Sequence, residues 1–257
     1  MNAANFDLSS YLSRIGFNGN PVGDFETLKR LMRCQLFSVP FENLDVQAGQ
    51  VPSLVPEEIC DKIVKRRRGG YCYEVNAIFA MALEALGIPY RFVAARPMTY
   101  PVRRPKTHMA IIASIDGAEW LCDLGFGSYG IREPINLEWL DRQIVQECDT
   151  FRLTMVSERD YRLQSLADGE WKALYEFNLC PHELVDFEPA NWLNATHPDS
   201  IFVQAPIVVL QHASGKTVLS GERFRAVSEE GQVEERCVGE NEIEELLRAC
   251  FGLDWHP

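Results

Sequence analysis

The hydrophobic pattern of this chain changes near residue 90, and the change limits how the chain can fold. Before that point, apolar residues recur every three or four positions, as on a helix that buries one face. The first such set is Leu8, Tyr11, Leu12 and Ile15. After it, short apolar runs are separated by turn residues, which is the pattern of β-strands. We therefore expect an α+β fold whose first third is helical.

Start and stop signals divide the helical part into segments. Asp24 is a suitable N-cap for a helix that ends before Pro40. Pro56 suits the first turn of the next helix, which stops at Gly69-Gly70. A further helix is expected to begin around Cys72 and to end at Gly87.

The rest of the chain predicts strands, with a helix around 189–195 and a last helix that buries Ile243, Leu246, Leu247 and Cys250. The strand candidates are 90–96, 108–115, 120–124, 150–156, 161–166, 171–177, 206–212, 216–220, 223–228 and 233–238. This order predicts three domains. They are an N-terminal helical bundle in residues 1–87, a central β-barrel in 88–198 and a C-terminal α/β lid in 199–257.

The composition argues against several classes of function. A net charge of −12 does not suit general binding to nucleic acid, and the basic run Lys65–Arg68 is more typical of a solvated helix end. The eight cysteines form no CxxC pair or zinc-ligand spacing, so we expect no metal and no disulfide framework. No apolar run approaches the roughly 20 residues of a membrane span, and the N-terminus lacks a signal-peptide pattern. We expect a cytoplasmic protein.

One cysteine lies where a nucleophile is expected. Arg68–Asn76 reads RGGYCYEVN, which places Cys72 at the start of a helix, directly after two glycines that permit a sharp turn. Unpaired N–H groups and the helix dipole at that end favour a thiolate. The same residues also fit a buried structural cysteine after an ordinary helix break.

A thiol nucleophile needs a base, and a base needs an orienting group. Four of the five histidines, His182, His197, His212 and His256, lie beside prolines, at a strand end or at the C-terminus. His108 alone opens a strongly apolar strand.

A hairpin links His108 to a carboxylate. A two-residue turn at Asp116-Gly117 would place Ala110 opposite Asp123, so that His108 and Asp123 become diagonal neighbours on one face. A shift by one residue would separate them. Without that register, a satisfied core histidine and an unconnected aspartate explain the residues equally well.

Four segments in this order resemble the arylamine N-acetyltransferase family. They are Pro40–Leu44 (PFENL), Arg68–Asn76, Thr107-His108 and Asp123–Gly127 (DLGFG). The resemblance extends from about Tyr11 to the final helix and is weakest after about residue 200. Val75 and Leu124 are mild departures from the motifs.

The resemblance implies a helical bundle, a β-barrel and an α/β lid around a cysteine-protease-like triad of Cys72, His108 and Asp123. It also implies acetyl-CoA as the donor and arylamines, arylhydrazines or N-hydroxyarylamines as acceptors, as in xenobiotic metabolism. The acetyl group would pass through a thioester on Cys72, with ping-pong kinetics. The backbone N–H of Cys72 is a suitable oxyanion donor.

No Gly-rich phosphate loop of the Walker or dinucleotide type is present. We therefore expect CoA to be bound by Arg96, Arg103, Arg104 and Thr107, or alternatively by the segment 214–217. The acceptor pocket is predicted to include Phe41, Tyr71 and Phe126.

Two alternatives fit the same residues. The first is another thiol acyl enzyme, such as an amide synthase or a hydrolase, and the second is a non-catalytic binding module. The sequence allows either a monomer or a homodimer.

Overall fold

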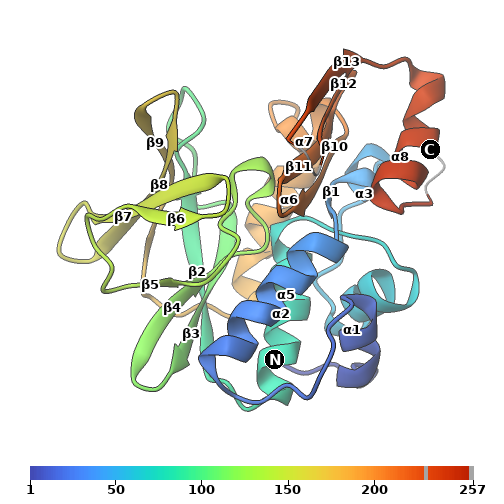
Figure 1. Ribbon diagram of the computed structural model, residues 1–257. Helices are drawn as coiled ribbons and strands as arrows, with labels where there is room; N and C mark the ends of the chain where they lie inside the picture. Colours follow the sequence, from blue (N-terminus) through green and yellow to red (C-terminus); the bar gives the residue numbers. More distant parts are fainter. Residues whose placement is uncertain (229–230, 255–257) are drawn as a thin grey trace.

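A computed structural model describes residues 1–228 and 231–254 (Figure 1). Helices dominate its first third, as the sequence predicts. Asp7 and Asp24 cap the first two helices, since each carboxylate accepts the backbone N–H three residues ahead. The elements are α1 (Leu8–Arg14), α2 (Phe25–Ser38), α3 (Leu44–Gln47), α4 (Pro56–Cys60), the π-helical turn η1 (Asp61–Lys65) and α5 (Cys72–Ala85).

Helix α5 lies at the centre of the molecule. Every residue from Cys72 to Leu83 is buried, so the helix has no solvent face over this length. It packs against the other helices on one side and against strand β3 on the other (Figure 1). Its first residue, Cys72, is therefore held inside the protein at the junction of helices and sheet.

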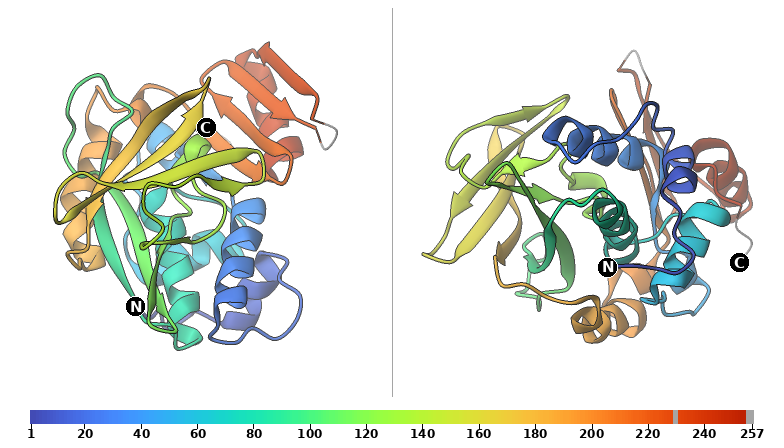
Figure 2. Two further views of the ribbon diagram at one scale, coloured as in Figure 1. Left: turned by 60° about the vertical axis from the view of Figure 1, so that its left-hand side comes forward. Right: turned by 90° about the horizontal axis from the view of Figure 1, so that it is seen from below.

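The middle of the chain forms a curled eight-stranded sheet in the order β5-β4-β3-β2-β9-β8-β7-β6 (Figure 2). Its strands are β2 (Tyr90–Pro97), β3 (His108–Ile115), β4 (Ala118–Cys122), β5 (Ile135–Asn136), β6 (Ile144–Gln146), β7 (Asp149–Met155), β8 (Asp160–Ala167) and β9 (Glu170–Asn178). Within the described residues, β5 and β6 are the two edges of the sheet and do not pair with each other. The predicted barrel is therefore an open half-barrel, because these edge strands of two and three residues are too short to extend the ladder to closure.

A second, five-stranded sheet has the order β1-β10-β11-β12-β13. Its strands are β1 (Phe41–Glu42), β10 (Ile207–His212), β11 (Gly215–Ser220), β12 (Arg223–Val227) and β13 (Val233–Cys237), and helix α8 (Glu240–Phe251) covers its outer face. Strand β1 comes from the helical third and pairs with β10, with Phe41 opposite Val209. Because Phe41 also bridges to Gly70, this pairing brings the small sheet next to the segment just before Cys72.

The elements η3 (Leu184–Phe187), α6 (Glu188–Thr196) and α7 (Ile201–Gln204) connect the two sheets. The proposed boundary at 198/199 falls between α6 and α7, which pack against each other. The division into three domains stays a prediction. No helix within residues 1–228 and 231–254 is both long and apolar enough to cross a membrane.

The hairpin β3–β4 has the predicted register. Ile115 pairs with Ala118 and Ile111 with Cys122. The turn residues Asp116 and Gly117 have φ angles of 52° and 77°, as a tight hairpin turn of this length requires. The register inferred from the turn is confirmed, and it places His108 and Asp123 at the same end of the hairpin.

Candidate active site

Backbone hydrogen bonds position the nucleophile loop. Gly70 bridges to Phe41, with Glu42 N donating to Gly70 O at 3.0 Å and Gly70 N donating to Pro40 O at 3.3 Å. The chain then enters α5 at Cys72, whose side chain is 3% exposed. The PFENL and RGGYC segments are therefore adjacent in space, and together they fix the helix end that carries the thiol.

His108 and Asp123 form a buried hydrogen-bonded pair. His108 Nε2 lies 2.7 Å from Asp123 Oδ2, and both side chains are buried. The imidazole packs against the rings of Phe126 and Tyr175, with centroid distances of 5.0 and 5.1 Å. Because Nε2 faces the carboxylate, Nδ1 is left for Cys72, which is also a hydrogen-bond partner of this ring.

The pair is electrostatically matched. Burial alone would lower the pKa of His108, but the charge and hydrogen bond of Asp123, together with Cys72, raise that pKa to about 10. Burial would likewise raise the pKa of Asp123, but His108 and the backbone N–H of Gly125 hold that pKa below its usual value. The arrangement favours an imidazolium–carboxylate pair at neutral pH, beside the sulfur.

Asn76 ties the nucleophile helix to the hairpin. Its side-chain amide donates to Met109 O at 2.7 Å and accepts from Leu124 N at 2.9 Å. Asn76 is the last residue of the RGGYCYEVN motif, and no role was predicted for it. Its position four residues after Cys72, on the same face of the helix, is the signal that could have indicated one.

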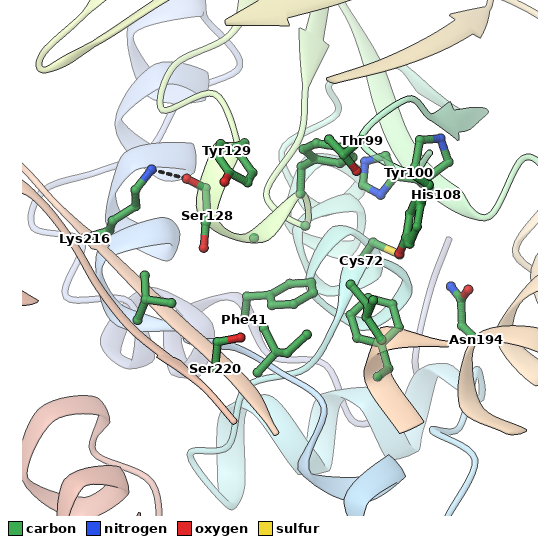
Figure 3. A pocket seen from close by; sticks show the side chains of 18 of the residues that line it. Phe41, Cys72, Thr99, Tyr100, His108, Ser128, Tyr129, Asn194, Lys216 and Ser220 are labelled. Carbon is green, nitrogen blue, oxygen red and sulfur yellow. Dashed lines mark hydrogen bonds between the residues drawn. The ribbon is translucent and has the colours of Figure 1, made fainter. Parts of the chain in front are cut away.

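The three side chains Cys72, His108 and Asp123 therefore converge, and the first two line a pocket of about 670 Å³ (Figure 3). One wall is apolar and includes Phe41, Phe126, Ile201, Phe202 and Ile207. Three cations from the small sheet, Lys216, Arg223 and Arg225, also line the pocket. A thiol beside an imidazole thus opens onto a pocket with an apolar wall and three cations, which suits an organic ligand with an anionic part.

Known proteins are similar to this chain in sequence and in fold. A family model described as N-acetyltransferase matches residues 24–256. The arylamine N-acetyltransferase of Mycolicibacterium smegmatis is 35% identical, over 96% of this chain and 92% of its own. The solved structure of Mycobacterium marinum arylamine N-acetyltransferase gives a TM-score of 0.90 at 30% identity, over 96% of this chain and 93% of that one.

The chain belongs to the arylamine N-acetyltransferase family. The resemblance seen in the sequence motifs is thereby confirmed, and the protein is an acetyltransferase of that family. A structure of the Mycobacterium marinum arylamine N-acetyltransferase in complex with CoA also matches, with a TM-score of 0.88 at 30% identity, over 96% of this chain and 93% of that one. Among the described residues of this acetyltransferase, no group of three or more His, Cys, Asp or Glu could hold a metal ion.

The residues predicted for the acceptor pocket divide into two sets. Phe41 and Phe126 line the pocket of this acetyltransferase. Tyr71 does not line it, because its ring is fully buried behind the nucleophile loop and its hydroxyl donates to Asn191 Oδ1. Its position is typical of a residue that supports the loop.

The arginines predicted to bind CoA lie outside the pocket. Thr107 lines it, but Arg96, Arg103 and Arg104 do not. Arg104 instead stacks over the ring of Tyr100 at 4.8 Å and donates to Asp199 O at 3.3 Å. Its charge therefore serves to hold Tyr100, which does line the pocket.

The cations that reach the pocket come from β11 and β12. Lys216 belongs to the segment 214–217, which was the alternative prediction for binding CoA. Arg223 and Arg225 were not predicted from the sequence. Lys216 donates to Ser128 O and approaches the ring of Tyr129, so it also holds the loop that follows Asp123. The two-residue spacing of Arg223 and Arg225 on a predicted strand puts both on one face, and this was the available signal.

Proposed function

We propose that this acetyltransferase moves an acetyl group from acetyl-CoA, through a thioester on Cys72, to aromatic acceptors. The acceptors are the nitrogen of arylamines and arylhydrazines, or the oxygen of N-hydroxyarylamines. The observation that carries the proposal is the convergence of Cys72 at a helix N-terminus with the His108–Asp123 pair in one pocket. Family membership and the CoA complex of a relative support the choice of donor.

The first half-reaction uses the thiol and the imidazole. His108 holds the Cys72 proton in a thiolate–imidazolium pair, and the thiolate attacks the carbonyl carbon of acetyl-CoA to form a C–S bond. The oxyanion that develops is stabilised by the backbone N–H of Cys72, one of the unpaired donors at the start of α5. The C–S bond to CoA then breaks, and His108 returns the proton to the departing CoA sulfur.

The second half-reaction repeats these steps with an amine. The amine nitrogen attacks the thioester carbonyl, His108 takes a proton from that nitrogen, and the Cys72 sulfur leaves. Asp123 stays ionised throughout and holds the imidazole in the orientation in which Nδ1 faces the sulfur. Phe41 and Phe126, in the apolar wall, provide a surface for an aromatic ring.

The first measurement is the intact mass of the protein after brief incubation with acetyl-CoA and no acceptor. We expect a gain of one acetyl group in the wild type and none in Cys72→Ala, followed by loss of the acetyl group when an arylamine is added. Discharge by water as fast as by amine would favour a hydrolase. Absence of any adduct on the wild type would refute acetyl-CoA as the donor.

We also propose that Lys216, Arg223 and Arg225 hold the anionic part of acetyl-CoA, in place of the arginines of the 96–104 segment. Because Arg223 is exposed and an exposed ion pair contributes about 0.2–1 kcal/mol, Arg223→Gln is expected to raise the KM for acetyl-CoA about two- to fivefold and to change kcat little. Arg103→Gln, outside the pocket, is the matched control for steady-state kinetics. A raised KM in Arg103→Gln and not in Arg223→Gln would favour CoA binding by the arginines of the 96–104 segment.

We also propose a cellular location and an oligomeric state. All eight cysteines are free thiols, which suits the reducing cytoplasm in which acetyl-CoA is available. The chain is proposed to act as a monomer or a homodimer.

A further inference from the structure

A buried group of charges lies directly behind the nucleophile loop. Lys62 Nζ contacts Glu74 Oε1 at 2.6 Å and Asp45 Oδ2 at 2.6 Å. Arg68 completes the group, since its guanidinium lies 2.8 Å from both Glu42 Oε1 and Asp45 Oδ1. The side chains of Lys62 and Glu74 are only 5% and 2% exposed, so their charges are poorly screened by solvent.

Glu74 connects this group to the nucleophile. It is the third residue of α5, and its Oε2 accepts the backbone N–H of Tyr71 at 3.1 Å. A Cβ on Gly70 would lie 2.6 Å from Glu74 Oε2, so the glycine leaves the space that the carboxylate fills. Glu74 therefore fixes the backbone on the N-terminal side of Cys72, where the oxyanion donor of the proposed function is found.

The charge of Glu74 would oppose the nucleophile if it were left alone. A carboxylate and a thiolate would then share one helix end, and like charges at short range in a buried site disfavour each other. Lys62 is the cation in direct contact with Glu74, and Glu42, Asp45 and Arg68 are the other charged groups packed around it. Burial and Glu42 raise the pKa of Glu74 to about 7, while Lys62 acts to lower it.

We propose, on the basis of the proposed function, that Lys62 and Glu74 are positioning residues for acyl transfer. Glu74 holds the Tyr71–Cys72 backbone in place, and Lys62 cancels the charge of Glu74 so that the thiolate can form beside it. Neither residue lines the pocket, so both act through Cys72.

The test measures how pH controls the alkylation of Cys72 by iodoacetamide, followed on the Cys72 peptide by mass spectrometry. This readout needs no acetyl-CoA, so its failure is distinguishable from failure of the proposed function. Lys62→Gln removes the cation that lowers the pKa of Glu74, so Glu74 should lose its proton only above neutral pH and then oppose the thiolate without compensation. We expect the midpoint of the profile to rise by about one pH unit. Glu74→Gln removes one carboxylate from the group while Lys62 keeps its contact with Asp45, so the net charge near Cys72 becomes more positive and the midpoint is expected to move in the opposite direction.

The double variant Lys62→Gln/Glu74→Gln separates charge from structure. Its amides can still donate and accept between the two positions, so the midpoint is expected to return towards that of the wild type whatever happens to the melting temperature. Lys62→Arg keeps the charge and should keep the profile. Lys65→Gln is the matched control, because Lys65 pairs at 2.6 Å with Asp61 on the exposed side of the same segment.

If Lys62 and Glu74 only stabilise the fold, the measurements give a different result. The melting temperature would fall in the single variants while the midpoint stayed at its wild-type value, and that outcome would overturn the proposal. If Lys62→Gln does not fold, Glu74→Gln and the double variant still test the proposal. The proposal requires that Glu74→Gln lower the midpoint of the alkylation profile and that the double variant cancel this shift.

Discussion

Replacing Asp123 by asparagine is expected to slow acetylation of Cys72 about 10³- to 10⁴-fold while leaving the fold intact. The amide has the same shape as the carboxylate but presents an N–H₂ group to His108 Nε2, at the present 2.7 Å contact. The imidazole then carries its proton on Nδ1, the nitrogen that must accept the Cys72 proton. The rate is measured by rapid quenching and intact mass.

The same variant makes a prediction about protonation. Asp123 raises the pKa of His108 to about 10 against the effect of burial, so the wild-type imidazole should stay protonated at pH 8. Without Asp123, burial lowers the pKa of His108 against the effect of Cys72 alone, and the ring should be neutral at that pH, as read from its ¹⁵N shifts. Because the folded pKa is raised, this charge contributes stability that is full below the ordinary pKa of 6.5 and is lost as pH approaches 10.

Asp141→Asn is the control for this experiment. Asp141 is an exposed loop residue with a φ of 55°, a conformation that asparagine also tolerates. We expect its acetylation rate to equal that of the wild type. Retention of the wild-type rate within tenfold in Asp123→Asn would exclude the proposed role of the carboxylate.

Local signals in the sequence were sufficient to predict that His108 and Asp123 lie together. The dipeptide Asp116-Gly117 determines a two-residue turn, and the turn determines which residues of the hairpin are opposite each other. The start of α5 at Cys72 follows in the same way from the two glycines before it. These features depend on neighbours in the chain, so they could be predicted without the fold.

The cations of the pocket depend on distant parts of the chain and could not be predicted in this way. Arg223 and Arg225 reach the pocket that Cys72 lines because β1 pairs with β10, and no residue pattern within either strand indicates that pairing. The arginines of the 96–104 segment are nearer in sequence to His108, but Arg96 lies on β2 and Arg104 is held by Tyr100 and Asp199 O.

Burial also changed the interpretation of the basic run Lys65–Arg68. Lys65 is exposed, as expected for a solvated helix end, but Arg68 turns inward to Glu42 and Asp45. Its partners lie in the PFENL segment and just after it, so this ion pair joins two of the motifs on which the resemblance rests. The basic run alone does not indicate which of its side chains pairs with buried carboxylates, because those carboxylates lie more than twenty residues away in the chain.

Replacing Gly125 by alanine is the second substitution for which we expect a large effect. A Cβ at this position would lie 2.4 Å from Cys72 Cα and 2.7 Å from Cys72 Cβ, and 3.1 Å from Asn76 Nδ2. These are backbone or short side-chain atoms of a buried helix end, so they cannot move aside independently. Either the start of α5 or the segment after Asp123 must shift, and both carry the proposed catalytic groups.

We expect Gly125→Ala to lose at least about 10²-fold in kcat, because a displacement of about 1 Å between reacting groups costs that much. Overpacking should also lower the free energy of unfolding by about 1–3 kcal/mol, measured by urea denaturation. Gly130→Ala is the control, since the nearest atom to its Cβ would be 3.7 Å away and its φ is not positive. If Gly125→Ala is destabilised but keeps its kcat, the contact between the two motifs serves only the fold. A loss of activity in Gly125→Ala alone would show that the DLGFG segment sets the position of Cys72 as well as that of His108.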